Sequence, residues 1–193
     1  MNLRILLLPF FLMLALCFQA QITDNFNDGD FTQNPTWQGT NADFTVNASG
    51  ELQLNSLAAA TSHLSTPHLL GNLNDKEWQI KVRQTFSPSS SNFGKVFLTA
   101  DNADMTLVQN GYYLLFGETG STDAIRLFAL NAGVATQICA GTDGQISASC
   151  NASVKVKRDG AGLWSLYADL SGGTNYTLLS TGSDASTLLG THF

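Results

Sequence analysis

The chain has 193 residues, of which 44% are hydrophobic and only 12% are charged, and its formal net charge is −6. This length suits one domain with a sizeable core. An acidic chain without a run of five or more lysine or arginine residues is a poor partner for nucleic acid or an anionic membrane, whereas it is compatible with cations and neutral glycans.

Residues 1–20 predict an export signal. Arg4 supplies the positive start, Ile5–Cys17 is an almost unbroken apolar run, and small Ala20 stands where a peptidase would cut. The run is shorter than the ~20 residues that a transmembrane helix needs. Cleavage is therefore favoured over a retained anchor, and the mature protein is expected to start near Gln21, without a membrane span, outside the cytoplasm.

Short strands separated by turns are predicted along the rest of the chain. The clearest lies at 77–86, where Trp78, Ile80 and Val82 share one face and Lys81 and Arg83 share the other. Turn-forming pairs such as Ser-Gly, Asn-Gly and Asp-Gly separate the runs, and no long window has helical spacing. The predicted strands are 43–46, 51–55, 61–66, 77–86, 95–100, 112–118, 124–130, 134–139, 154–157, 164–170 and 176–180.

Roughly eleven antiparallel strands predict an all-β fold, most simply a two-sheet antiparallel jelly-roll sandwich, with an up-and-down barrel as the alternative. Residues 112–116 are apolar on both faces, which is typical of a central strand covered on both sides. A single domain is expected over 21–193. Because 186–193 reads as the approach to a strand, we expect the closing strands to be missing, unless these last residues close the sandwich themselves.

Several motifs together resemble the N-terminal concanavalin-A-like module of exported surface proteins of Bacteroidetes-type bacteria. They are DNFNDGDF at 24–31, NPTW at 34–37, DFTVN at 43–47, LQLN at 52–55, ICAGT at 138–142, VKRD at 156–159, GLWSLYAD at 162–169 and GGTNY at 172–176. The resemblance implies a concanavalin-A-like jelly roll, a secreted or outer-surface location, and downstream domains such as a lamin-tail-like domain and a type IX sorting domain. It assigns no activity to particular residues.

The segment 24–30 is the candidate metal site. Asp24, Asp28 and Asp30 offer the oxygen ligands that calcium prefers, and neighbouring asparagines could add to them. The alternative is an Asx-rich turn whose side chains bind their own backbone. Structural Ca²⁺ is the one cofactor that the sequence predicts.

Aromatic side chains supply the candidate carbohydrate site. Sugars stack on exposed tryptophan or tyrosine rings beside polar groups, and the candidates are Trp37, Tyr112, Tyr113 and Tyr167. Tyr167 fits best, because its position in the alternation places it outside while Trp164 points inward. The alternative is that these rings belong to the core.

Catalytic residues are harder to find. A glycosidase needs two carboxylates, ~5–5.5 Å apart in retaining enzymes, yet no Glu-x-Asp-x-x-Glu motif occurs and Glu118 is the best acid available. His63 and His68 lie near hydroxyl residues, but no Gly-x-Ser-x-Gly elbow accompanies them.

Two cysteines follow the signal, Cys139 and Cys150. An exported compartment permits a disulfide between them, and two buried thiols are the alternative. Without a Cys-x-x-Cys motif or a Cys/His cluster, zinc is not expected.

The sequence therefore favours a non-catalytic exported β-sandwich that binds polysaccharide or cell-surface glycan, or is adhesive. One alternative is a divergent glycoside hydrolase or lyase. Another is an architectural spacer within a large adhesin.

Overall fold

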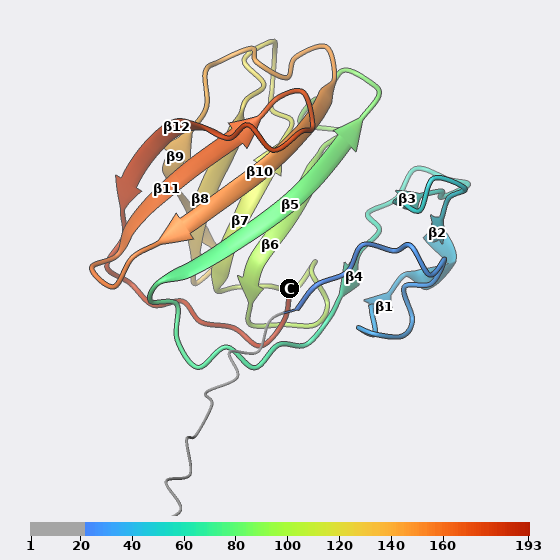
Figure 1. Ribbon diagram of the computed structural model, residues 1–193, viewed down its shortest axis with the longest axis horizontal. Helices are drawn as coiled ribbons and strands as arrows, with labels where there is room; N and C mark the ends of the chain where they lie inside the picture. The colour runs from blue at the N-terminus through green and yellow to red at the C-terminus, as the bar shows by residue number, and fades with distance from the viewer. Residues whose placement is uncertain (1–21) are drawn as a thin grey trace, which may run out of the picture.

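The computed structural model describes residues 22–193, so the predicted signal peptide at 1–20 lies outside the described residues. Two four-stranded antiparallel sheets face each other as a sandwich, and two small two-stranded sheets lie beside it (Figure 1). The all-β sandwich prediction is confirmed. Within 22–193 the only helical segment is the 3₁₀ turn η1 (Asn41–Asp43), and no helix is long and apolar enough to span a membrane.

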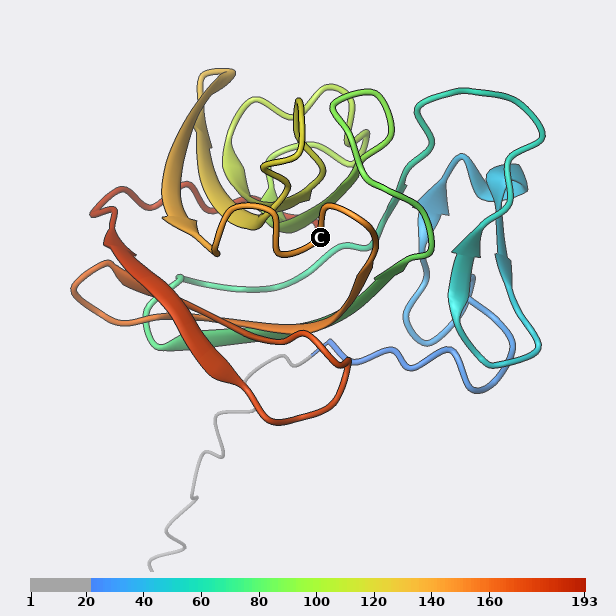
Figure 2. The same ribbon diagram turned by 90° about the horizontal axis from the view of Figure 1, so that it is seen from above.

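The two layers are seen edge-on in Figure 2. The first, the β7 sheet, has the order β6-β7-β8-β9, with β6 (Gly94–Ala100), β7 (Gly111–Phe116), β8 (Ile125–Asn131) and β9 (Val134–Ala140). The second, the β10 sheet, has the order β12-β11-β10-β5, with β5 (Lys76–Gln84), β10 (Cys150–Arg158), β11 (Leu163–Asp169) and β12 (Thr177–Ser183). Because each sheet is filled mainly by consecutive strands, the jelly-roll part of the expectation stays a prediction.

The small sheets precede the sandwich in the chain. One pairs β1 (Gln38–Gly39) with β4 (Leu64–Ser65), and the other pairs β2 (Phe44–Val46) with β3 (Leu52–Leu54). Every predicted strand overlaps an observed one. β1 alone has no counterpart in the prediction, because two residues carry no periodic pattern and become a strand only through their distant partner.

Side-chain alternation builds the core between the sheets. Trp164 of β11 is completely buried, and its ring stacks on Trp78 of β5, with centroids 5.8 Å apart and planes 19° from parallel. Tyr112 of β7 reaches the same indole from the opposite sheet, at a centroid distance of 4.5 Å. Burying side chains of this size stabilises the fold by about 1.5–3 kcal/mol each, so this aromatic contact joins the two layers.

A polar network closes one end of this core. The hydroxyl of Tyr112 donates to the carboxylate of Asp184 at 2.8 Å. Arg158 is 3% exposed and donates to Asn74 Oδ1 at 2.9 Å and to the carbonyl of Ser186 at 3.2 Å. These hydrogen bonds fasten the chain after β12 across the end of the sandwich, and they offset part of the cost of burying the Tyr112 hydroxyl and the Arg158 guanidinium.

The last four residues, 190–193, lie between the segment after β4 and the end of β6. The amide of Thr66 donates to the carbonyl of Phe193 at 3.1 Å, and the amide of Phe193 donates back at 2.9 Å. On the other side Thr191 N–H donates to Ala100 O at 2.8 Å. These residues extend the sheet edge, and the expectation that further closing strands are missing stays a prediction.

His68 packs against this terminal segment in its neutral form. Its ring lies 4.4 Å from that of Phe193, its Nδ1 accepts the amide of Leu70 at 3.2 Å, and its Nε2 lies 3.2 Å from the hydroxyl of Thr99. Desolvation of the buried ring, with a further contribution from His192, lowers the pKa of His68. Protonation would place a hydrogen on Nδ1, which could then no longer accept the hydrogen bond from the Leu70 amide.

This arrangement predicts a pH-dependent stability. With the pKa lowered by folding, the contribution of His68 is complete above its ordinary pKa of 6.5 and is lost as the pH falls towards the folded value. In chemical denaturation, the free energy of unfolding should fall as the pH is lowered below about 6.5, and His68→Gln should flatten that dependence. An identical pH dependence in the variant and the parent protein would contradict the assignment.

Candidate functional site

A groove of about 450 Å³ lies on the outer face of the β7 sheet. Alternation explains its origin, because Val96 and Leu114 point into the core while Lys95, Tyr113 and Leu115 point the other way. We call it the Lys95 groove, and its lining consists of Ser90, Phe93, Lys95, Tyr113, Leu115, Gly117, Glu118 and Thr119.

An aromatic row supports the floor of the groove. Phe97, Tyr113 and Phe128 are directly opposite one another on β6, β7 and β8. Adjacent ring centroids are 5.3 Å apart in both pairs, so the rings fix each other in place. Tyr113 is 5% exposed, burial raises the pKa of its hydroxyl, and that hydroxyl has no hydrogen-bond partner among the described residues. It therefore remains protonated and available to a ligand.

The loop between β5 and β6 forms one wall. Ser89 and Asn92 exchange backbone hydrogen bonds of 3.0 and 3.2 Å, which holds the loop tip as a tight turn. Phe93 follows and is 48% exposed. The loop can approach β7 only because Gly117 has φ +130° and no side chain, since a Cβ there would lie 2.9 Å from the Cβ of Phe93.

Charged side chains fix the far end of the groove. Glu118 forms an ion pair with Arg126 Nε, and the same guanidinium reaches Asp143 at 2.7 Å and the amide oxygen of Gln137 at 3.3 Å. The backbone amide of Glu118 donates to the buried carboxylate of Asp123 at 2.6 Å. Glu118 is therefore held in one position, with its charge balanced by Arg126.

Lys95 differs from Glu118, because its charged group lies against aromatic rings and not beside a group of opposite charge. Its ammonium lies 4.5 Å from the ring centroid of Tyr113 and 5.9 Å from those of Phe93 and Phe97. Within 22–193 no carboxylate lies within ion-pair distance of it. Partial burial desolvates the ammonium and lowers the pKa of Lys95.

The structure separates the four predicted aromatic residues. Tyr113 lines the groove. Tyr112 is completely buried against Trp164, so its prediction as a sugar platform is wrong: the next residue along a strand faces the opposite way. Trp37 is absent from the lining of the groove and donates its indole N–H to Asp24 at 2.8 Å.

Tyr167 lies on the outer face of the β10 sheet, beneath Lys155, whose ammonium is 5.6 Å from its ring. Its outward orientation is as predicted, but it does not join Tyr113. Phe93 and Lys95 were missed as site residues. Alternation over 93–97 was the available signal, and it could not reveal which outer face is hollow.

The acidic segment forms a series of Asx turns. Asp24 accepts the amide of Phe26 at 2.9 Å, Asp28 accepts that of Asp30 at 3.2 Å, and Asp30 accepts that of Thr32 at 2.7 Å. Within 22–193 no group of three or more His, Cys, Asp or Glu side chains is arranged to hold a metal ion. The calcium site stays a prediction.

Calcium binding is checked by thermal unfolding. An ion held by Asp24, Asp28 and Asp30 in the folded state stabilises that state by mass action. EDTA should then lower the Tm and an excess of CaCl₂ should restore it. The same Tm in EDTA and in CaCl₂ would contradict the prediction that these three aspartates bind calcium.

Cys139 and Cys150 are both free and buried. The structure therefore has the two separate thiols that the sequence left open as the alternative, and not the disulfide. Burial raises the pKa of Cys150 to about 11 and also raises the pKa of Cys139. Neither thiol is poised to react near neutral pH.

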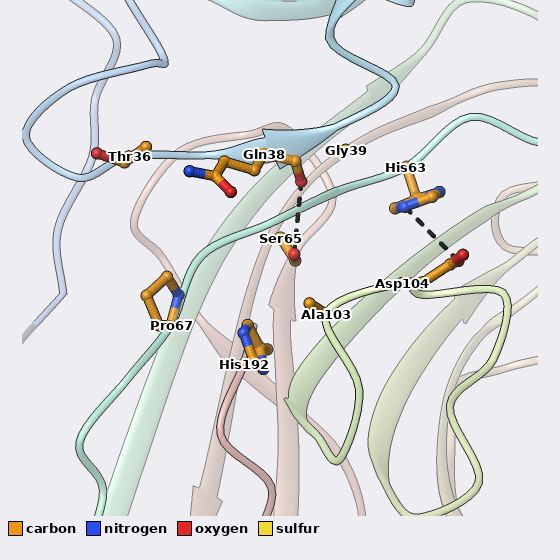
Figure 3. A pocket seen from close by; sticks show the side chains of 9 residues that line it. All are labelled: Thr36, Gln38, Gly39, His63, Ser65, Pro67, Ala103, Asp104 and His192. Atoms are coloured by element: carbon orange, nitrogen blue, oxygen red, sulfur yellow. Dashed lines mark hydrogen bonds and ion pairs between the residues drawn. The ribbon is translucent and has the colours of Figure 1, made fainter.

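A second hollow, of about 430 Å³, lies between β1, β4 and the loop after β6 (Figure 3). His63 Nε2 faces Asp104 at 3.6 Å, while the hydroxyl of Ser65 donates to the carbonyl of Gln38 at 3.4 Å. Ser65 is thus directed to the backbone and not to His63, so these residues do not form a nucleophile–base pair. None of the described residues that line this hollow is a phenylalanine, tyrosine or tryptophan.

Comparison of the chain with protein-family models, with curated proteins and with solved structures finds no match. The resemblance to Bacteroidetes surface modules therefore rests on the sequence motifs and stays a prediction.

Proposed function

We propose that the protein is an exported, non-catalytic β-sandwich module that binds carbohydrate in the Lys95 groove at the bacterial cell surface. The observation that carries the proposal is the combination of an exposed aromatic wall, Phe93, with fixed polar groups at the floor and far end. Export is supported by the signal sequence at 1–20.

These groups match the chemistry of a sugar. A pyranose ring has an apolar face of C–H groups and a rim of hydroxyls, so it needs an aromatic surface beside hydrogen-bonding groups. Phe93 supplies the surface, Glu118 accepts from hydroxyls, and the Tyr113 hydroxyl can donate or accept. Since Glu118 and Tyr113 are already held by their neighbours, ligand binding costs little side-chain ordering.

The groove also favours binding over a purely architectural role. A spacer needs no ligand groove, whereas here an exposed aromatic side chain lines an open hollow together with polar groups that their neighbours hold in place.

The binding proposal is tested with Phe93→Ala and the matched control Phe86→Ala. Both rings are solvent-exposed, at 48% and 40%, but only Phe93 lines the groove. In affinity electrophoresis against plant, algal and microbial polysaccharides, Phe93→Ala should weaken retention about tenfold through loss of the stacking surface. Phe86→Ala should not change it. Equal effects of both variants, or no retention of the parent protein, would overturn the proposal.

A divergent glycoside hydrolase or lyase is the second candidate, because Glu118 lies in the groove. It is the one carboxylate among the described residues that line it, whereas glycosidases use a pair of carboxyl groups on either side of the bond that is cleaved. We therefore expect no release of reducing sugar from mixed polysaccharides. Release that Glu118→Gln abolishes would identify an enzyme instead.

A further inference from the structure

Charge in the Lys95 groove is distributed unevenly. At the far end, Glu118 and Asp143 share the guanidinium of Arg126, so the one cation there is already paired and negative charge is in excess. At the near end the ammonium of Lys95 lies over aromatic rings, with no carboxylate at ion-pair distance among the described residues. An accessible, unpaired cation is thus fixed beside the sugar-stacking wall.

We propose that the groove selects an anionic sugar unit, whose carboxylate or sulfate group pairs with Lys95. This inference rests on the proposed carbohydrate function and specifies its ligand class. Cation–π contacts position the ammonium, since the Tyr113 centroid lies 4.5 Å away. The ligand anion replaces hydration that the surrounding side chains already restrict, so pairing at this site costs less desolvation than at a free lysine.

The orientation of the sugar follows from the two ends. Its anionic group lies at Lys95, and its neutral hydroxyls lie at Glu118, where a second anion would be repelled. A unit with one acidic group and several hydroxyls satisfies both ends at once.

The net charge of −6 does not oppose this selection. Charges more than ~8 Å apart are largely screened at physiological ionic strength. Several of the aspartates lie in the 24–30 segment, outside the lining of the groove. The net charge of the chain is compatible with cations and neutral glycans, but the charge of the ligand depends on the side chains that line the groove, among which is Lys95.

Lys155 provides a matched control on the other sheet. Its ammonium also lies over tyrosine rings, 4.2 Å from Tyr176 and 5.6 Å from Tyr167. It interacts electrostatically with the nearby carboxylate of Glu77, and it is absent from the lining of the groove. Its replacement removes the same charge and the same kind of contact without altering the Lys95 groove.

The test is calorimetric titration of the mature full chain with polygalacturonate, a sulfated galactan, and the neutral polysaccharides laminarin and mannan. Binding of polygalacturonate or of the sulfated galactan should exceed neutral binding and should weaken with added NaCl. Lys95→Gln should reduce it at least about tenfold. Lys95→Arg should retain most of it, and Lys155→Gln should leave it unchanged.

The outcomes separate the two proposals. Preference for polygalacturonate identifies a carboxylate and preference for the galactan identifies a sulfate, and both support the inference when Lys95→Gln removes them. Binding of neutral polysaccharide alone, or anionic binding that Lys155→Gln weakens equally, overturns the selection by Lys95 and leaves the carbohydrate function standing. No binding to any of the four overturns both.

Discussion

The alternation of side chains along β7 sends Tyr112 into the core and Tyr113 to the outer face, and much of the molecule depends on that division. Inside, Tyr112 meets Trp164 at 4.5 Å and donates its hydroxyl to Asp184. It thereby joins both sheets and the segment after β12. Outside, Tyr113 stacks on Phe128 and supports Lys95. One central strand thus supplies both the contact that holds the sandwich and the floor of the groove.

The outer faces of the two sheets carry similar side chains, but only the face of the β7 sheet has the Lys95 groove. Each has a lysine over tyrosine, Lys95 on the β7 sheet and Lys155 on the β10 sheet. On the β10 sheet the cation has Glu77 nearby. On the β7 sheet the loop before β6 forms the wall of a groove. The loop can approach β7 because Gly117 has no side chain. Function is therefore proposed where a loop hollows the face, since a flat face of the same composition offers a ligand fewer contacts.

The sequence predicted the strands well because period-two alternation is a local signal. In β5, Trp78, Ile80 and Val82 have the inward orientation expected of them. The candidate site was predicted less well. Tyr112 and Tyr113 are equally aromatic neighbours, and only the position of the opposite sheet decides which one faces the core between the two sheets. Phe93 shares the parity of Lys95 and Phe97, but alternation does not reveal that the loop held by the turn between Ser89 and Asn92 forms a wall of the groove.

The sequence alone determined that the described chain is a set of short antiparallel strands and that Trp164 and Tyr167 face opposite ways, because each follows from neighbours two residues apart. The tertiary structure decided the rest. It left Cys139 and Cys150 as separate thiols, paired Glu118 with Arg126, and placed no carboxylate of the described residues at ion-pair distance from Lys95. These outcomes depend on contacts between segments that are far apart in the sequence, and the alternation of side chains along a single strand does not predict such contacts.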